Sequence, residues 1–319
     1  SYLVGGYIRD LILGRLNSLI DIDIIVPKNA IEVGKKIADK FQGKFIILDD
    51  EREVIRIIFK HISIDIASQI STSITTDLFS RDFSINAIAF SFEKKFLIDP
   101  SNGIKDLQLS LLRTNSKQNL LDDPLRILRC FRFVSELNFN VDVNLINFIK
   151  IYKNQLSLVA NERINFEIKR IIRGGKASQA IKLINKLKVF DHIQSEKDLI
   201  FIDLEKISFE EFNKYEREKF LPLFFLVQIL DEVSLKNLKF MKSEISKIRV
   251  LRKWIFLLKI KTIYELNEKE RFDLHQELET ILPSFILFLP KIFFIEWLAR
   301  WRDKDDKLFH PSNLINGDF

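Results

Sequence analysis

Apolar residues at the start of the chain follow first the period of a short strand, then that of a helix, then that of a second strand. The apolar run Tyr2–Val4 stops at Gly5-Gly6, and the apolar residues of Ile8–Ile12 have helical spacing. A further apolar run ending at Val26 contains Asp21 and Asp23. Since alternate residues of a strand share a face, both carboxylates are expected to project to the same side.

Beyond this stretch, the pattern predicts a mixed α and β region followed by helices. Helical spacing marks Ala30–Phe41, and alternating or apolar runs predict strands at Phe45–Leu48, Val54–Phe59 and Ile62–Ile66. After Leu111 the pattern becomes helical. The longest apolar region, Ile281–Leu298, is interrupted by prolines and charges, so it predicts buried helices rather than a membrane span. The fold class is therefore expected to be α+β, with a small mixed sheet in the first part and helices in the rest.

The first stretch also contains the parts of a nucleoside triphosphate site. A glycine pair alone is most often a turn, and an Asp-x-Asp pair alone is most often a solvated strand end. In this order, however, Gly5, Gly6 and Arg9 could position phosphates, while Asp21 and Asp23 could hold magnesium for phosphoryl transfer.

Asp65 is a further candidate metal ligand. It lies on the polar face of the strand expected at Ile62–Ile66, and it could complete the metal site if that strand lies beside the one with Asp21 and Asp23. The alternative is that Asp65 is a solvated aspartate on the face of the sheet.

A second group of polar residues interrupts an apolar segment, Arg81–Ala89, which we predict to be helical. A helix would place Asp82 and Asn86 on one face, where they could hydrogen-bond a ribose while Arg81 meets phosphate. The alternative is an N-capping aspartate followed by an incidental asparagine.

A third group opens the segment Asp122–Phe133, where an aspartate followed by Pro124 signals the start of a helix. Asp123 and Arg126 are candidates for reading the edge of a base, because a carboxylate accepts from an exocyclic amine and a guanidinium donates to a ring nitrogen or carbonyl. Arg126, Arg129 and Arg132 recur every third residue, a pattern that more often marks a solvated face.

The composition permits a nucleic-acid partner without requiring one. The 319 residues carry a formal charge of +6 and contain one cysteine, which excludes an intramolecular disulfide and fits a reducing compartment; we expect the cytoplasm and no membrane. Between Lys236 and Lys261 nine basic residues face one acid, Glu244. An RNA backbone could lie there, although an ordinary basic helix surface over aromatic core residues is a close competitor. The predicted RNA-binding residues are Lys236, Lys239, Lys242, Arg249, Arg252 and Lys253.

Six blocks in chain order, LVGGYIRDLILG, DIDIIV, RDFSINAIAF, DPSNGIKDL, DDPLRILRCFRF and ERINFEIKRII, resemble the class II tRNA nucleotidyltransferase and poly(A) polymerase family. The resemblance implies a polymerase-β-like head (residues 1–113), a helical neck (114–158) and an all-α body and tail that bind tRNA (159–319). It also implies the reaction, in which the 3′ hydroxyl of tRNA attacks the α-phosphate of CTP or ATP and pyrophosphate leaves.

The resemblance assigns roles residue by residue. Asp21 and Asp23 match the catalytic ligands of Mg²⁺. In the base-reading motif, Asp122 replaces the usual glutamate, while Asp123 and Arg126 are intact. The positions implied to bind nucleotide are Gly5, Gly6, Arg9, Arg81, Asp82, Asn86, Asp123, Arg126, Arg129, Arg132 and Arg163.

One departure from the family concerns the segment Ser68–Ser80, where relatives have a longer flexible segment described as a lever in the switch from C to A addition. The intact site predicts full CCA addition to tRNA from CTP and ATP. The short segment raises the alternative of partial addition, either CC only or A only. A poly(A) polymerase and a non-catalytic RNA-binding relative are the other readings.

Overall fold

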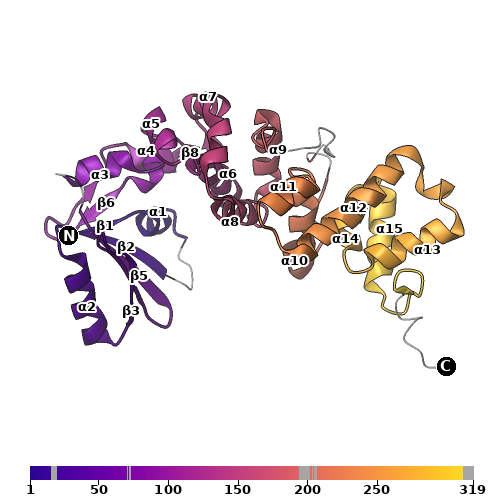
Figure 1. Ribbon diagram of the computed structural model, residues 1–319, viewed down its shortest axis with the longest axis horizontal. Coiled ribbons are helices and arrows are strands. Elements are labelled where there is room, and N and C mark those ends of the chain that lie inside the picture. Colours follow the sequence, from indigo (N-terminus) through magenta and orange to yellow (C-terminus); the bar gives the residue numbers. More distant parts are fainter. Residues whose placement is uncertain are drawn as a thin grey trace. The chain divides into compact units, whose positions relative to one another are not determined.

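The computed structural model describes residues 1–15, 20–69, 71, 73–193, 202, 204 and 207–311 (Figure 1). It divides into two compact units: unit 1 contains Ser1–Arg126 and Phe139–Tyr152, and unit 2 contains Ile127–Asn138 and Lys153–Phe319. The division into head, neck, body and tail at residues 113 and 158 stays a prediction.

Unit 1 is built on a seven-stranded mixed sheet with the order β3-β4-β5-β2-β1-β6-β7. Strands β2 and β5 are parallel, and the other neighbouring pairs are antiparallel. The strands are β1 (Tyr2–Val4), β2 (Ile20–Val26), β3 (Lys44–Asp49), β4 (Val54–Ile58), β5 (Ile62–Ser68), β6 (Ala89–Ser91) and β7 (Leu97–Ile98). The α+β class predicted from the pattern is confirmed, and the three strands and the helix expected between residues 30 and 66 are present.

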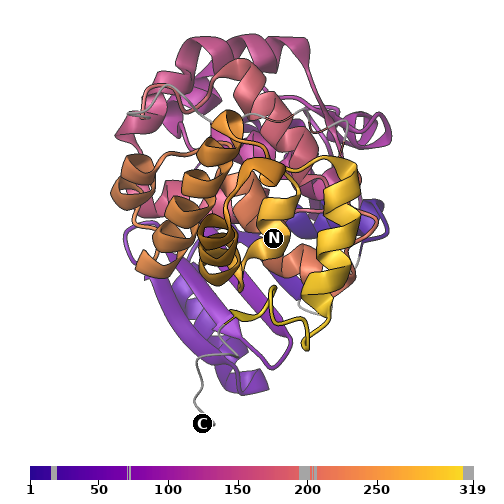
Figure 2. The same cartoon turned by 90° about the vertical axis from the view of Figure 1, so that its right-hand side faces the viewer.

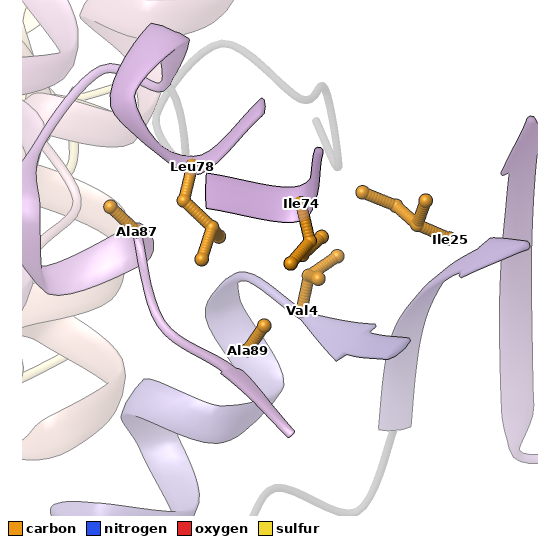
Figure 3. Packing of buried hydrophobic residues seen from close by; sticks show 6 residues of the cluster. All are labelled: Val4, Ile25, Ile74, Leu78, Ala87 and Ala89. Carbon is orange, nitrogen blue, oxygen red and sulfur yellow. The ribbon is translucent and has the colours of Figure 1, made fainter. Parts of the chain in front are cut away.

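Helices cover both faces of this sheet because β2 is apolar on both of its faces at its C-terminal end. Val26 packs with Ala30 and Ala38 of α2 (Ala30–Phe41), whereas Ile25 lies on the opposite face. On that opposite face, Ile74 of α3 (Ile74–Ser80) packs with it (Figure 3). The remaining helices of unit 1 are α1 (Gly6–Ile12), η1 (Ser84–Asn86), α4 (Gly103–Gln108), α5 (Lys117–Asp122) and α7 (Val143–Tyr152).

The helix expected over Arg81–Ala89 is not formed, which corrects that prediction. Helix α3 ends at Ser80, Arg81 and Phe83 are extended, and only the short 3₁₀ turn η1 follows. The reason is burial on all sides: Phe83, Ile85, Ala87, Ile88 and Ala89 are all fully buried, so the segment crosses the core and shows no one-sided helical pattern.

The neck region (114–158) was predicted to be helical, but it also contains a short strand. Strand β9 (Asn140–Val141) pairs in parallel with β8 (Leu111–Leu112). The preceding helix, α6 (Arg126–Leu137), ends where Asn138 adopts a left-handed conformation with φ of 62°. The chain then extends and buries Phe139, which places the two following residues beside β8.

Unit 2 is helical in the part that the structure describes, and its C-terminal helices face the viewer in Figure 2. The expected buried helices between Ile281 and Leu298 are present as α14 (Leu282–Ile286) and α15 (Lys291–Arg302). None of the described helices has the length and apolar character needed to cross a membrane. The other elements of the unit are η2 (Lys153–Leu158), α8 (Asn161–Ile171), α9 (Ala177–Leu187), α10 (Lys214–Leu226), α11 (Glu232–Asn237), α12 (Lys242–Ile260), η3 (Ile263–Glu265) and α13 (Glu268–Leu278).

Candidate active site

The two aspartates of β2 lie on one face of the sheet, as strand alternation predicts. In the sheet register, Asp23 stands between Val4 of β1 and Asp65 of β5. Asp65 in turn stands opposite Arg56 of β4, which donates to its two carboxylate oxygens at 2.7 and 2.8 Å. Three carboxylates, those of Asp21, Asp23 and Asp65, therefore lie on this face, and the charge of Asp65 is balanced by Arg56.

Asp21 and Asp23 have the donor chemistry that Mg²⁺ prefers, namely negatively charged oxygen atoms on neighbouring positions of one face. Among the described residues, no group of three or more His, Cys, Asp or Glu side chains is arranged to hold a metal ion. Asp65 is engaged by Arg56 instead. The assignment of Asp21 and Asp23 as metal ligands, with Asp65 as a third, stays a prediction.

Burial and the neighbouring charges act on the pKa of Asp23 in opposite directions. Burial raises its pKa, the nearby Arg81 guanidinium lowers it, and the charges of Asp65 and Asp21 raise it further, with a net upward shift. The ionised carboxylate of Asp23 is therefore less stable in the fold than in water. A cation at this carboxylate would relieve the repulsion, which is the electrostatic setting expected of a metal ligand.

The backbone at Gly5 passes close to the side chains of Asp23 and Arg81. Its φ is +78°, and a Cβ atom at this position would lie 2.7 Å from Oδ2 of Asp23 and 3.0 Å from NH1 of Arg81. Only a glycine fits both the backbone conformation and the space. The predicted site residues Gly5, Asp23 and Arg81 are therefore brought together.

Arg9, Asn86 and Asp82 form a second connected group. Arg9 donates from NH1 to Oδ1 of Asn86 at 2.7 Å, and Asn86 donates from Nδ2 to Oδ1 of Asp82 at 2.9 Å. Asp10 accepts from Nε and NH2 of Arg9, both at 2.9 Å, and holds its guanidinium in place. Asp82 and Asn86 were predicted to share one face of a helix, and they do lie together, although that helix is not formed. Their ribose-binding role stays a prediction.

Two acidic residues near the site were not singled out by the sequence. Asp10 orients Arg9, and Asp77 accepts from Nε of Arg81 at 3.4 Å. The spacing of Asp77 and Arg81, four residues apart, was the available signal, because such pairs meet on a helix.

Arg126 is attached to the end of α3. Its NH1 donates to the carbonyl oxygens of Ser80 at 2.8 Å and Asn119 at 3.0 Å. Asp123 lies between α5 and α6, and its Oδ1 accepts from the backbone N–H of Leu125 at 3.3 Å. The predicted base-reading pair therefore sits at the junction of α3, α5 and α6.

Arg132 does not lie on a solvated face, and the structure also corrects its assignment to nucleotide binding. Its side chain is 6% exposed, and its guanidinium donates from NH1 to both carboxylate oxygens of Glu167, at 2.8 and 3.1 Å. Burial lowers the pKa of Arg132 to about 10, although the charge of Glu167 opposes this. Arg132 is therefore a buried structural residue of unit 2. The roles of Arg129 and Arg163 stay predictions.

Glu167→Ala is expected to lower the free energy of unfolding by about 3–5 kcal/mol, because it removes the carboxylate to which the buried Arg132 guanidinium donates. Glu136→Ala is the matched control. Glu136 lies farther from Arg132, 3.8 Å from its Nε, and pairs at 2.8 Å with the half-exposed Arg170, so its loss is expected to cost less than the loss of Glu167. Urea denaturation measures both values, and equal costs for the two variants would contradict the structural role given to the Arg132–Glu167 pair.

The predicted RNA-binding surface is largely neutralised in the fold. Glu232 pairs with Lys236 and Arg249, Glu162 pairs with Lys239, and Glu277 pairs with Lys253. Arg252 is 6% exposed, so its prediction as an RNA contact is wrong. Lys242 is exposed at the start of α12. These acids lie outside α12, on α8, α11 and α13, so a count along α12 alone overstates the local charge.

The fold and the arrangement of the site define a nucleotidyltransferase. Residues 1–113 match the family model described as "Poly A polymerase head domain", and residues 138–199 match "Probable RNA and SrmB- binding site of polymerase A". The chain belongs to the class II family of CCA-adding enzymes and tRNA nucleotidyltransferases that share this head domain.

Similar proteins agree with this assignment. The chain is 29% identical to a CC-adding tRNA nucleotidyltransferase of Synechocystis, over 99% of the chain and 82% of that protein. It is 36% identical to a CC-adding tRNA nucleotidyltransferase of Geobacter sulfurreducens, over 54% of the chain but only 40% of that protein. A solved structure of a CCA-adding enzyme in an apo form matches with a TM-score of 0.74 at 24% identity, over 100% of this chain and 80% of that one, which supports the fold.

Proposed function

We propose that this chain transfers cytidine nucleotides from CTP to the 3′ end of tRNA and stops at CC. In this reaction the 3′ hydroxyl oxygen bonds to the α-phosphorus of CTP, and the bond from that phosphorus to the bridging oxygen breaks. Pyrophosphate then leaves with the electron pair of the broken bond, and the proton of the 3′ hydroxyl passes to solvent. When bound, Mg²⁺ supplies a charge that favours the ionised 3′ hydroxyl and neutralises the phosphates.

Different residues of unit 1 would bind the metal, the triphosphate and the base. Asp21 and Asp23 would hold the metal, and Arg81, beside Asp23 across Gly5, would contact the triphosphate. Asp123 and Arg126 would read the base with a carboxylate acceptor and a guanidinium donor. Selection then depends on protein side chains without a nucleic-acid template.

CC addition is supported by the short connection between β5 and α3, because most of the segment Ser68–Ser80 belongs to these two elements. Strand β5 extends to Ser68, and α3 already begins at Ile74. Within α3, Ile74 and Leu78 are buried against Val4 and Ile25 of the sheet (Figure 3). A segment that is packed into this core cannot act as a long flexible lever. The carbonyl oxygen of Ser80, the last residue of α3, accepts from the guanidinium of Arg126. We therefore infer that this guanidinium keeps one orientation.

Two similar proteins named for CC addition, from Synechocystis and Geobacter sulfurreducens, support the same reading. Full CCA addition is the second candidate, because Asp123 and Arg126, the pair implied to read both bases, are present. Under that reading the pair would reorient without a lever.

The test is to incubate the protein with tRNA that lacks the 3′ trinucleotide, together with CTP and ATP, and to sequence the product ends. Ends that stop at CC are expected. Ends carrying CCA would contradict the proposed arrest and support full addition. A long homopolymer made from ATP alone on a non-tRNA primer would instead indicate a poly(A) polymerase.

A further inference from the structure

The C-terminal end of α3 is closed by side chains from the segment that leads to the base-reading pair. The last carbonyl groups of a helix have no partner within the helix and need other donors. Asn119 of α5 donates from Nδ2 to the carbonyl oxygens of Phe79 at 2.8 Å and Arg81 at 2.6 Å. The carbonyl oxygen of Ser80 between them accepts from NH1 of Arg126.

Asn119 is fixed in one orientation. Asn119 is only 5% exposed, and its Oδ1 accepts a hydrogen bond from the hydroxyl of Ser116 at 2.6 Å. Each side of the amide therefore has its proper partner: the oxygen faces a hydroxyl donor, and the NH₂ group faces two carbonyl acceptors. The buried amide is satisfied only while α3 and α5 keep this arrangement.

Asn119 also determines where Arg126 points. Both acceptors of NH1 of Arg126 depend on it, because one is the backbone carbonyl of Asn119 itself and the other is the carbonyl of Ser80, between the two that it binds. A guanidinium group is planar and rigid, so fixing two acceptors at NH1 fixes the direction of the opposite edge. Within the described part of the chain, Nε and NH2 of Arg126 have no protein acceptor, which leaves this edge for a base.

We propose that Asn119 is a positioning residue for nucleotide selection, acting through Arg126. This inference rests on the proposed function, since it concerns how the same site distinguishes bases. Asn119 holds the backbone of Arg81 as well, and the Arg81 guanidinium lies beside Asp23 across Gly5. The base-reading arginine and the phosphate-side arginine are thus connected through one buried amide.

Asn119→Asp tests the proposal, because aspartate has the same shape but an ionised carboxylate cannot donate to the carbonyl groups of Phe79 and Arg81. The measured quantity is selectivity, the ratio of kcat/KM for CTP to that for UTP on tRNA that lacks the 3′ trinucleotide. Selectivity is expected to fall roughly ten-fold, the size of losing one well-placed base contact. A merely structural role would lower kcat/KM for both nucleotides by the same factor.

Asn115→Asp is the matched control. Asn115 also closes the end of α3, donating to Phe79 at 3.2 Å and Leu78 at 3.5 Å, but it provides no acceptor for Arg126. It is expected to change the melting temperature without changing selectivity. If Asn119→Asp does not fold, Asn119→Ala removes the same donors without adding a charge, and the same loss of selectivity is expected.

The outcomes separate the two claims. A wild-type protein that incorporates no nucleotide contradicts the proposed function. A wild-type protein that selects CTP, beside folded Asn119 variants that select it equally well, overturns the role of Asn119. Equal losses of selectivity in the Asn115 and Asn119 variants would overturn it too, because they would assign the effect to the end of α3 in general.

Discussion

Asp23→Asn is expected to abolish nucleotide incorporation, with a loss of about a thousand-fold or more. Asparagine keeps the shape of the side chain but removes the negative charge that would hold a divalent cation beside Asp21. Single-turnover incorporation of CTP measures the loss. Asp39→Asn, at an exposed position of α2, is the control and is expected to keep the wild-type rate. A wild-type rate in Asp23→Asn would contradict the metal assignment.

The same substitution is expected to stabilise the fold at neutral pH. Since burial, reinforced by Asp65 and Asp21, raises the pKa of Asp23 against the opposing effect of Arg81, folding favours the protonated form. That stabilisation is complete below the ordinary pKa of aspartic acid and is lost as the pH rises through the raised value. In urea denaturation with a chelator, the advantage of Asp23→Asn should therefore be largest at neutral pH and shrink in acid. An advantage that grows in acid would contradict this explanation.

Gly5→Ala is expected to reduce kcat about a hundred-fold, because displacing a reacting group by about 1 Å can cost that much. A Cβ atom 2.7 Å from Oδ2 of Asp23 must move that carboxylate. The backbone conformation, with φ of 78° and ψ of −143°, adds strain of about 1–3 kcal/mol.

Gly14→Ala separates these two effects in a comparison of turnover and melting temperature. Gly14 also has a positive φ, +66°, but a Cβ atom there meets nothing within 4 Å. It is expected to lose stability and keep turnover. If Gly5→Ala loses no more turnover than Gly14→Ala, the close approach of Gly5 to Asp23 has no catalytic importance.

Much of unit 1 could be predicted because its signals are local. The alternation in β2 and β5 places Asp21, Asp23 and Asp65 on one face, and the helical period of Ala30–Phe41 matches α2 to the residue. The segment Arg81–Ala89 could not be read in this way. From Asp82 to Ala89 it is buried on all sides, so its apolar residues have no period that separates a helix from an extended chain.

The errors at charged residues have one physical origin. Arg132 and Arg252 were read as surface residues because a sequence shows the neighbours along the chain and not those across the fold. Glu167 neutralises Arg132 from α8, and Glu277 neutralises Lys253 from α13. Asn119 escaped notice for the same reason, since its amide bonds to carbonyl groups about forty residues earlier in the chain.

We propose that the carboxylates of β2 and the arginine at the start of α6 belong to the site of one untemplated tRNA-end polymerase. The most direct measurement is the transfer of α-labelled CMP to tRNA that lacks its 3′ trinucleotide, with CTP as the sole nucleotide and no template present. Two labelled cytidines per tRNA, with none from UTP under the same conditions, is the predicted result. No transfer from CTP, or equal transfer from CTP and UTP, would contradict this assignment.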